Sequence, residues 1–384
     1  MVKSKTIMIV AGEASGDLHA GALARELLCS DPSLKLVGVG GTEMKKAGVE
    51  LLADISSLNV MGLTELGGKL KGVIKVFLDL LREMQKRRPA LVILVDFPDF
   101  NLLLARFAKR YGIPIMYYIS PQVWAWRRGR TRTIARLVDK MVVILPFEVD
   151  FYRRYGVEVE FVGHPLLDAL CDVPGKDEAR KLLGIDHDSK VIGILPGSRL
   201  SEVKKLLGVM LDAVEEIRKV FPDMVCMFPL ANTLSKEDLT FVNPECLKRV
   251  SIQSGETSLV MRACDLLIAA SGTVTLEAAI LGTPLVIIYK LSPVSYRIGR
   301  LLIRVPYIGL VNLVAGERLA PELIQDEAIP RNIADEAIAI LKDRSKQEYI
   351  KKRFSDVRKL LGKPGASSKA ARLVLNFINR ETEK

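Results

Sequence analysis

The sequence predicts an α/β protein built from two doubly wound, Rossmann-like domains that face each other across a cleft. Three observations predict this class: the length of 384 residues, a repeated alternation of short apolar runs with helical patterns, and a polar stretch that separates two series of such runs. A chain of this length usually divides into two cores, and 49% hydrophobic with 26% charged residues is ordinary for a globular protein. Because doubly wound sheets bind ligands at the carboxyl ends of their strands, we expect the active site in the cleft between the domains.

The first domain is predicted over residues 1–170 and the second over residues 171–345. Buried parallel strands read as short, nearly continuous apolar runs, and turn residues follow each run here. We expect the linker in the polar stretch 171–176, and we expect residues 346–384 to form C-terminal helices, the last of which packs back onto the first domain. The apolar runs lie at residues 6–12, 34–40, 90–97, 113–120 and 140–147 in the first domain, and at residues 191–198, 223–230, 265–272 and 283–290 in the second.

Charge and composition narrow the possible partners. The formal net charge of +11 favours contact with a polyanion, and charge alone leaves nucleic acid, anionic lipid headgroups and phosphorylated substrates open. The five cysteines and three histidines show no metal-ligand spacing, so we expect no metal and no other cofactor, and the scattered thiols are typical of a reducing cytoplasm. The N-terminus runs directly into a strand pattern rather than a signal-peptide cleavage site, and the chain lacks the roughly 18 consecutive apolar residues of a spanning helix.

A glycine-containing turn after the apolar run at 265–270 is the first candidate phosphate site. Ser271, Gly272 and Thr273 open a predicted helix, where free backbone N–H groups and the helix dipole attract an anion and glycine allows a diphosphate to approach closely. Glu277 lies one turn into that helix, where it can accept hydrogen bonds from ribose hydroxyls. The alternative, of equal weight on this motif alone, is that residues 271–273 only cap the helix.

A second glycine turn, Gly197-Ser198-Arg199, follows another predicted strand. Arg199 can pair with phosphate oxygens in a bidentate geometry, and neutralising a departing diphosphate is the main electrostatic task in sugar transfer from a nucleotide. The alternative is a capped helix with a solvated arginine. Two phosphate-type turns in one half of the chain favour nucleotide binding.

Carboxylates follow two strands of the first domain. Glu13 and Ser15 lie in a turn that is not GxGxxG and carries two acids, which would repel a pyrophosphate, so we assign it to the acceptor or to the geometry of the cleft. Asp96 and Asp99 follow a later strand, where a carboxylate could remove the proton of an attacking sugar hydroxyl. Because Asp99 is expected to be a helix N-cap, Asp96 is the better candidate base.

Both tryptophans, Trp124 and Trp126, lie beside a basic pair at residues 127–128. Their faces can stack on sugars or acyl chains, and packing inside the first domain is an alternative of equal weight. A base-stacking surface for nucleic acid would use the same residue types, but such platforms repeat along a chain and these tryptophans do not.

Two segments, residues 69–88 and 295–304, predict amphipathic helices that each carry a basic face. Such a helix can lie on a membrane surface. Taken alone, each segment is more simply a helix that packs on the core.

A set of short motifs runs along the chain from Ala11 to Gln325. The motifs are AGEASGD, MGLTEL, DFPDFN, YYISPQVWAWR, LPFE, GHP, LPGSR, ASGTVTLEAA and NLVAGERLAPELIQ. The combination of SPQVWAWR with ASGT and Glu277 is distinctive, whereas any one glycine turn would be weak evidence. Taken together and in this order, the motifs make the chain resemble the lipid-A-disaccharide synthase family.

The resemblance implies a glycosyltransferase-B fold and a family 19 glycosyltransferase of lipopolysaccharide biosynthesis. Such an enzyme transfers 2,3-diacylglucosamine with inversion, and without a metal, from its UDP donor to 2,3-diacylglucosamine 1-phosphate, giving the β-1,6 disaccharide 1-phosphate and UDP. By the same resemblance Asp96 is the essential acid and candidate base, and Arg199 is an essential phosphate-facing residue. The implied donor site comprises Gly197, Ser198, Arg199, Ser271, Gly272, Thr273, Glu277, Asn312, Gly316, Glu317 and Gln325.

Acylated substrates must be drawn from a membrane, so the resemblance also implies a cytoplasmic protein that associates peripherally with the inner membrane. We hypothesise that Met61, Leu66 and residues 69–88 dock on an anionic bilayer and guide acyl chains into the first domain. The serine substitutions expected to release the protein from anionic vesicles are at Val73, Phe77 and Leu78.

Other functions stay open beside this one. The nearest is another UDP-N-acetylglucosamine-type glycosyltransferase or epimerase of the same fold. A basic nucleic-acid-binding module would cluster its charge on one face and bind DNA in a strongly salt-dependent way, and a non-catalytic membrane adaptor would not be stabilised by UDP. The resemblance favours the synthase, with no nucleic acid among its partners, and leaves the oligomeric state open.

Overall fold

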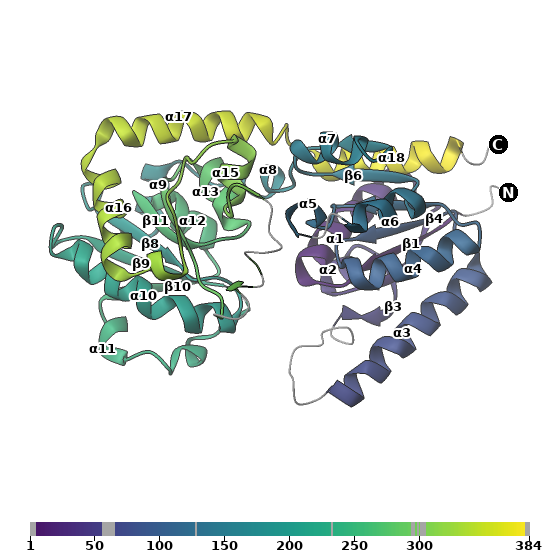
Figure 1. The fold of residues 1–384 in the computed structure, drawn as a ribbon, viewed down its shortest axis with the longest axis horizontal. Coiled ribbons are helices and arrows are strands. Elements are labelled where there is room, and N and C mark those ends of the chain that lie inside the picture. The colour runs from purple at the N-terminus through teal and green to yellow at the C-terminus, as the bar shows by residue number, and fades with distance from the viewer. Residues whose placement is uncertain are drawn as a thin grey trace. The chain divides into compact units, whose positions relative to one another are not determined.

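The structure, a computed structural model, describes residues 5–55, 66–126, 129–231, 233–292, 296–297, 299 and 305–380, and of residues 66–70 and 126 only the backbone. The chain forms two compact units (Figure 1). The first comprises Met1–Asp168 together with Gly362–Lys384, and the second comprises Ala169–Leu361. Each unit has a parallel sheet and a hydrophobic core of its own.

The first unit is built on a seven-stranded parallel sheet of strand order β3-β2-β1-β4-β5-β6-β7. The chain builds the sheet outward from β1 in one direction and from β4 in the other, so the strand order reverses between these two strands. Doubly wound sheets bind ligands outside the carboxyl ends of the strands at such a switch point. The strands are β1 (Thr6–Ala11), β2 (Lys35–Gly40), β3 (Glu50–Asp54), β4 (Leu91–Val95), β5 (Ile115–Tyr118), β6 (Lys140–Val143) and β7 (Val159–Phe161).

Helices accompany this sheet, and their packing explains the apolar runs of the sequence. Every residue of β4, LVILV, is buried, as expected of a strand in a parallel sheet with helices on its faces. The helices are α1 (Ala14–Ser30), α2 (Thr42–Lys46), α3 (Leu66–Arg87), α4 (Pro98–Arg110), α5 (Val123–Trp126), α6 (Gly129–Leu137), α7 (Phe147–Arg153), α8 (Leu166–Ala169) and α18 (Ala366–Arg380).

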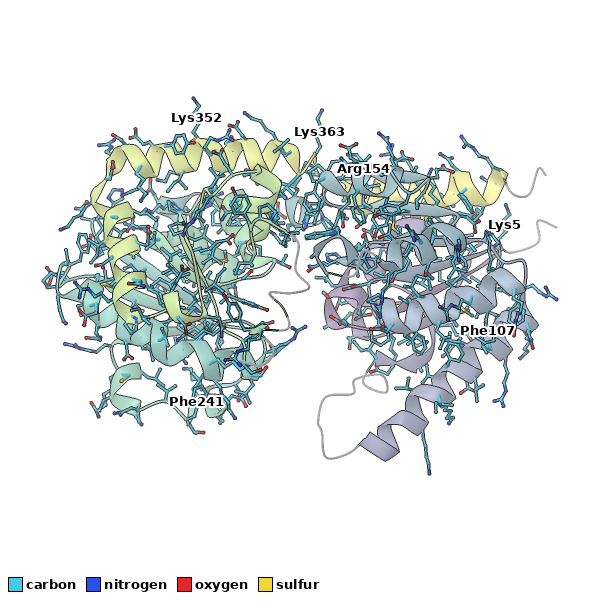
Figure 2. The ribbon with its side chains drawn as sticks, viewed as in Figure 1. Lys5, Phe107, Arg154, Phe241, Lys352 and Lys363 are labelled. Carbon is cyan, nitrogen blue, oxygen red and sulfur yellow. The ribbon has the colours of Figure 1, made fainter. Side chains whose placement is uncertain are left out.

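The amphipathic helix α3 packs one face on the core and leaves the other exposed. Phe77 lies edge to face with Phe107 of α4, at 5.6 Å between ring centroids, and Figure 2 labels Phe107 on that helix. Val73 also packs against the core, whereas Ile74 and Leu78 are 49% and 45% exposed. The apolar face of α3 is therefore shared between the core and a pair of exposed aliphatic side chains.

The last helix, α18, belongs to the first unit. It packs against α1, and the Lys5 ammonium, labelled in Figure 2, donates to Asn379 Oδ1 over 3.0 Å at its far end. At its beginning the Asp168 carboxylate accepts hydrogen bonds from the backbone N–H groups of Gly365 and Ala366. A carboxylate at a helix N-terminus satisfies otherwise unpaired donors, so Asp168 anchors the start of this helix.

The second unit is built on a six-stranded parallel sheet of strand order β10-β9-β8-β11-β12-β13. Its switch point lies between β8 and β11. The strands are β8 (Val191–Leu195), β9 (Val225–Leu230), β10 (Val250–Ser254), β11 (Leu266–Ala270), β12 (Leu285–Tyr289) and β13 (Glu322–Ile324). The helices are α9 (Lys176–Leu182), α10 (Leu200–Arg218), η2 (Lys236–Leu239), α11 (Pro244–Leu247), α12 (Thr257–Ala263), α13 (Val274–Leu281), α15 (Leu310–Ala315), η3 (Gln325–Glu327), α16 (Pro330–Lys342) and α17 (Arg344–Leu360).

The unit boundaries differ from the expected domains in two places. Residues 346–384 do not form one group, because α17 packs on α13, α15 and α16 of the second unit while α18 belongs to the first. The expected linker 171–176 lies inside the second unit, where a polar network anchors its end.

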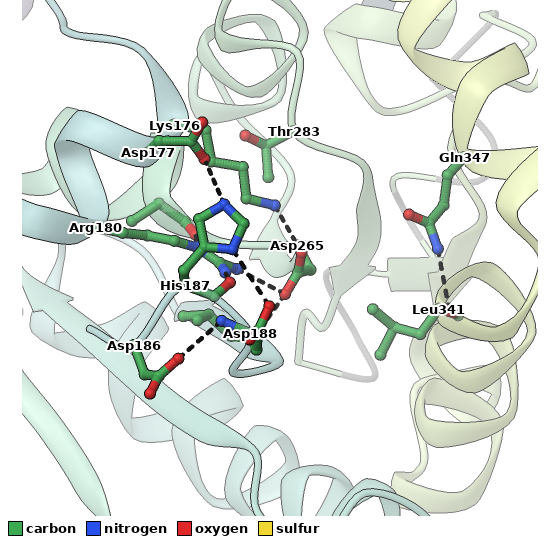
Figure 3. A network of polar contacts seen from close by, with 12 residues as sticks. Lys176, Asp177, Arg180, Asp186, His187, Asp188, Asp265, Thr283, Leu341 and Gln347 are labelled. Atoms are coloured by element: carbon green, nitrogen blue, oxygen red, sulfur yellow. Dashed lines mark hydrogen bonds and ion pairs between the residues drawn. The ribbon is translucent and has the colours of Figure 1, made fainter.

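Figure 3 shows that network around Asp265. The Asp265 carboxylate accepts from Lys176 Nζ over 2.6 Å, from Arg180 Nη2 over 2.9 Å and from the backbone N–H of Val191 over 2.8 Å. Burial alone would raise the pKa of this carboxyl, but its donors, Lys176 first, hold the pKa below its ordinary value. The network fixes the start of α9 to the amino ends of β8 and β11, which is the edge of the sheet opposite the candidate donor turns.

Within the described ranges, no helix combines the length and the apolar composition that crossing a bilayer requires.

Candidate active site

The turn after β4 holds the candidate base Asp96 in an uncommon backbone conformation. Asp96 and Phe97 have φ angles of 45° and 47°, in the left-handed region. This conformation costs roughly 1–2 kcal/mol for a residue with a side chain. Such residues persist where the surrounding structure over-determines them, and they cluster at functional sites.

Two fully buried polar side chains hold the Asp96 carbonyl oxygen. Asn101 of α4 donates to it from Nδ2 over 2.8 Å, and the hydroxyl of Tyr117 donates to it from β5. The same amide donates to Val95 O over 3.2 Å. Neither side chain stands out as a site residue in the sequence, where the available signal was a polar atom inside an otherwise apolar stretch.

The Asp96 carboxyl is perturbed in the direction a general base requires. Burial first, and then the charge of Glu13, raise its pKa to about 6, although the backbone N–H of Phe97 acts in the opposite direction. A general base is most effective when its pKa lies near the working pH. At neutral pH this carboxyl is mostly ionised and remains more basic than an ordinary aspartate.

The turn after β1 lies against the same turn. A Cβ on Gly12 would lie 2.3 Å from the Phe97 ring, so only glycine fits without a displacement. Glu13 is the N-cap residue of α1 and Ser15 lies in its first turn, and both side chains are exposed. Glu13 thus lies close enough to Asp96 for its charge to affect the Asp96 pKa, whereas Ser15 lies in the first turn of the helix.

Asp17, the second acid of the GEASGD motif, has a different place. It is buried, and its carboxylate accepts from the backbone N–H groups of Gly41 (2.6 Å), Glu43 (2.9 Å) and Met44 (3.1 Å). These are the free donors at the start of α2. Asp17 therefore caps a neighbouring helix and ties α1 to α2.

Asp99 is not the N-cap that the sequence predicted. Phe97 occupies the N-cap position of α4 and Pro98 begins the helix, which moves Asp99 into the first turn. Its side chain is 74% exposed and pairs with Arg130 of α6. The proline explains the shift, since its fixed φ and missing N–H suit the first helical position.

Trp124 is buried inside the first unit. Its indole Nε1 donates to Glu148 Oε1 over 3.0 Å, and its ring packs edge to face on Phe147 at 4.9 Å. Of the two interpretations left open by the sequence, packing therefore describes Trp124. Trp126 was the other stacking candidate, and its side chain lies outside the described residues.

In the second unit, the turn from β11 into α13 is open. The helix starts at Val274 with Thr273 as N-cap, and the Thr273 side chain makes no capping hydrogen bond, in contrast to the capping alternative. A Cβ added to Gly272 would meet nothing within 4 Å. An uncapped helix start beside free space presents backbone N–H groups to an anion.

Ser271 and Glu277 flank this turn differently. Ser271 Oγ donates to Ile308 O over 2.8 Å, which ties the turn to the segment before α15. Burial raises the pKa of Glu277, and within the described parts of the chain no hydrogen bond or ion pair engages its carboxyl. Glu277 is therefore available to a ligand hydroxyl.

The turn after β8 lies one strand away. Gly197 has a φ of 116°, and a Cβ there would lie 2.2 Å from Glu202 Oε2, so the turn requires glycine. Ser198 is exposed and its carbonyl accepts from Thr233 Oγ1 over 2.6 Å. Arg199 is 58% exposed with Nη1 3.5 Å from Glu202 Oε1.

Tyr289, at the end of β12, belongs to the same edge of the sheet. Burial raises the pKa of its hydroxyl, and smaller electrostatic contributions come from Glu202 and Arg199. The carboxyl ends of β8, β11 and β12 thus gather the two predicted phosphate turns, as their places in one parallel sheet require.

The predicted donor residue Asn312 is buried and uses its whole side-chain amide inside the unit. Nδ2 donates to Ala320 O and to Glu322 Oε1, each over 2.8 Å, and Oδ1 accepts from the backbone N–H groups of Leu319 and Ala320. A side-chain amide offers two donors and two acceptor sites, so none is left for a ligand. The Asn312 side chain therefore stabilises the fold of residues 316–322.

Three further predicted donor residues also make internal contacts. Gly316, with a φ of 73°, ends α15. The Glu317 carboxylate pairs with Arg353 of α17, over 2.7 Å to Nε. Gln325 Oε1 accepts from Leu291 N over 2.6 Å and its Nε2 donates to Leu291 O over 3.3 Å. This side-chain amide therefore makes to Leu291, after β12, the two hydrogen bonds that the backbone of a neighbouring strand would make.

Across the described part of the chain, no three histidine, cysteine or carboxylate side chains are placed to hold a metal ion together.

Comparisons with known proteins identify the fold and then the family. UDP-GlcNAc 2-epimerase from Neisseria meningitidis, bound to UDP-GlcNAc, matches with a TM-score of 0.66 at 14% identity over 97% of this chain and 100% of that chain. Acinetobacter baumannii MurG matches with a TM-score of 0.59 at 13% identity over 97% and 99%. The chain therefore has the glycosyltransferase-B fold of two Rossmann-like domains.

The sequence model described as lipid-A-disaccharide synthetase matches residues 7–377. The lipid-A-disaccharide synthase of Syntrophus aciditrophicus is 48% identical over 99% of both chains, and that of Geobacter sulfurreducens is 46% identical over 98% of both. The chain belongs to the lipid-A-disaccharide synthase family, and it is an enzyme of the glycosyltransferase class.

Proposed function

We propose that this enzyme transfers 2,3-diacylglucosamine from its UDP donor to 2,3-diacylglucosamine 1-phosphate, with inversion at the anomeric carbon. The acceptor 6-hydroxyl attacks that carbon, its bond to the UDP oxygen breaks, and the hydroxyl proton passes to the protein. The products are the β-1,6 disaccharide 1-phosphate and UDP. Family membership supports the reaction, and the half-buried Asp96 carboxyl, with its raised pKa, is the observation that carries the mechanism.

We assign proton removal to Asp96 of the first unit. Its carboxyl lies directly after β4 at the switch point of the sheet, where doubly wound folds place reactive groups. Glu13 assists by disfavouring a second negative charge beside its own, which makes the Asp96 carboxylate a stronger base. Ser15 and Asp99 are left to acceptor binding, with Asp99 held by Arg130.

We assign the diphosphate to the two turns of the second unit. The uncapped start of α13 offers backbone donors, and Arg199 offers a largely exposed guanidinium for the charge that develops as UDP leaves. Glu277 accepts from ribose hydroxyls. Asn312 acts indirectly, by bonding Glu322, whose carboxylate holds the segment that Ser271 contacts. Gly316, Glu317 and Gln325 also act indirectly, by ending α15, by pairing with α17 and by bonding Leu291.

The reaction needs no metal ion in this scheme, because the donors named above take the role of neutralising the leaving group. The test is incubation of the purified enzyme with both substrates in the presence of a chelator. UDP and the disaccharide 1-phosphate should form in equal amounts. Isomerised donor without acceptor consumption would indicate an epimerase instead, and no UDP release would end the proposal.

We further propose that the enzyme works at the cytoplasmic surface of the inner membrane, with α3 as the docking element. Ile74 and Leu78 are exposed on α3, and Lys71 and Lys75 lie exposed on the same helix. An exposed apolar pair beside lysines suits the surface of an anionic bilayer. Met61 and the side chain of Leu66, named in the docking hypothesis, lie outside the described residues, as does most of the second basic segment, 295–304.

The structure changes how this docking should be tested. Val73 and Phe77 pack on the core, so serine at either position would destabilise the first unit and confound a binding assay. Ile74→Ser with Leu78→Ser should reduce binding to phosphatidylglycerol vesicles while leaving Tm unchanged. Leu182→Ser, at a 64% exposed leucine of the second unit, is the matched control. Equal vesicle binding by all three proteins would contradict the docking role of α3.

A further inference from the structure

The catalytic turn is held in its strained conformation by contacts from three directions. The Phe97 ring fills the space left by Gly12, α4 begins immediately after the turn, and β5 approaches from the side. Two consecutive non-glycine residues with positive φ would relax without such constraints. The contact from β5 is the hydroxyl of Tyr117.

Tyr117 places this one polar atom at the Asp96 carbonyl from an otherwise apolar environment. Its side chain is fully buried in the cluster that includes Phe100 and Leu104 of α4. Together with Asn101 it supplies two donors to one carbonyl oxygen, which matches the two lone pairs of that oxygen. A buried hydroxyl is retained at little cost only where it makes such a bond.

The bond fixes more than the carbonyl. The φ and ψ angles of Asp96 determine the direction in which its side chain leaves the backbone. The ψ angle also determines the orientation of its carbonyl, so a hydrogen bond that holds the carbonyl also holds the ψ angle. A turn that rotated toward an ordinary conformation would therefore swing the carboxyl away from its half-buried position beside Glu13.

We propose that Tyr117 is a positioning residue of the sugar transfer, whose hydroxyl locks the turn that aims the Asp96 carboxylate. The assignment rests on the proposed role of Asp96 as base. Tyr117, which is fully buried in the first unit, touches neither substrate and acts only through the backbone carbonyl of Asp96.

The adjacent strand residue supplies a matched control. Tyr118 is also fully buried, but successive residues of a strand face opposite sides of the sheet. Its hydroxyl lies near Ser367 of α18 rather than near Asp96. Tyr117→Phe and Tyr118→Phe each delete one buried hydroxyl from β5, and only the first deletes a contact to the catalytic turn.

The primary readout is the titration of the Asp96 carboxyl carbon by NMR, with Asp96→Asn to assign the signal. In the wild type the midpoint should lie near pH 6. In Tyr117→Phe it should fall toward the ordinary aspartate value, because a relaxed turn admits water to the carboxyl. Tyr118→Phe should leave that midpoint unchanged.

Turnover gives the second readout. Tyr117→Phe should lower kcat by about 10- to 100-fold, as expected for a misaimed reacting group, and leave the donor KM within about twofold. In the Asp96→Asn background the same substitution should have no further effect on kcat. Equal effects of Tyr117→Phe and Tyr118→Phe on both the titration and kcat would overturn the assignment. A wild type without UDP release would end the proposed function instead, and the titration would still decide whether Tyr117 positions Asp96.

Discussion

The carboxylate of Glu322 accepts a hydrogen bond of 2.8 Å from the side-chain amide of Asn312. The same buried carboxylate accepts from the backbone N–H groups of Ile308 and Gly309, each over 2.9 Å, where α15 begins. The carbonyl of Ile308 in turn accepts from Ser271 Oγ in the candidate diphosphate turn. One carboxylate therefore links the end of the family's last motif to the candidate donor turn.

Glu322→Gln should weaken UDP binding without removing it. A glutamine cannot accept from all three donors, so the segment before α15 should loosen and its contact to Ser271 should weaken. We expect an affinity for UDP about tenfold lower and a stability about 1–3 kcal/mol lower, the usual cost of unpaired buried donors. Calorimetric titration with UDP measures the first and denaturant unfolding the second. Glu327→Gln, at an exposed position nearby, should change neither. An unchanged affinity for UDP in Glu322→Gln would show that this network does not support the candidate donor turn.

Asp96→Asn should stabilise the protein at neutral pH while it destroys activity. The pKa of Asp96 is raised from 3.8 to about 6 by burial and by Glu13, so the folded state binds the proton more tightly than the unfolded state. Below pH 3.8 the Asp96 carboxyl therefore costs the folded state no stability. The free energy of unfolding falls as the pH rises from 3.8 through 6, and above pH 6 it is lower by about 3 kcal/mol, at 1.36 kcal/mol per pH unit. Asparagine carries no charge and escapes this loss. Unfolding measured at pH 4 and pH 7.5 should show a variant that gains only at the higher pH, and a gain of equal size at both would contradict the buried-charge explanation.

Trp124 should report the ionisation of Glu148. Burial raises the pKa of this carboxyl to about 7, against the opposing hydrogen bonds, and the carboxyl accepts directly from the indole N–H. In a Trp126→Phe background, tryptophan emission should titrate with a midpoint near pH 7. The additional change Glu148→Gln should abolish that transition while emission stays that of a buried indole. A transition that survives the glutamine would assign it to another group.

Arg199→Ala should reduce turnover without reducing stability. The side chain is largely exposed, so its loss leaves no buried donor behind, yet it belongs to the turn to which we assign the leaving diphosphate. Removal of one such donor costs on the order of 10²–10³ in kcat. Arg218→Ala, on the same helix but in its last turn, is the control for kcat. A kcat within twofold of wild type would show that Arg199 does not stabilise the leaving diphosphate.

The fold could be predicted from the sequence because parallel strands buried on both faces leave an unmistakable pattern. Runs such as LVILV have no polar face, and turn residues follow them at the carboxyl edge where the site forms. The unit to which α17 belongs could not be predicted, since a helix of purely amphipathic pattern does not show which surface its apolar face covers.

The motifs that form the candidate site could be predicted from the sequence, but the role of each residue in them could not. Asp96 and the turn at Ser271 follow from their place after a strand. The sequence does not show whether a polar residue faces a ligand or another part of the same unit, and this is why Asn312 and Gln325 were expected at the donor while their amides bond internally. Tyr117 was missed for the opposite reason, because inside an apolar strand it reads as core.

The pH dependence of kcat, in wild type and in Asp96→Asn, tests the assignment of Asp96 as the base most directly. For the wild type we predict that kcat rises about tenfold per pH unit at low pH and reaches a plateau above pH 6, where the carboxyl is ionised. Asp96→Asn should lower the plateau by roughly 10²–10⁴-fold and remove this acid limb. An asparagine variant that keeps both the limb and the plateau of the wild type would contradict it.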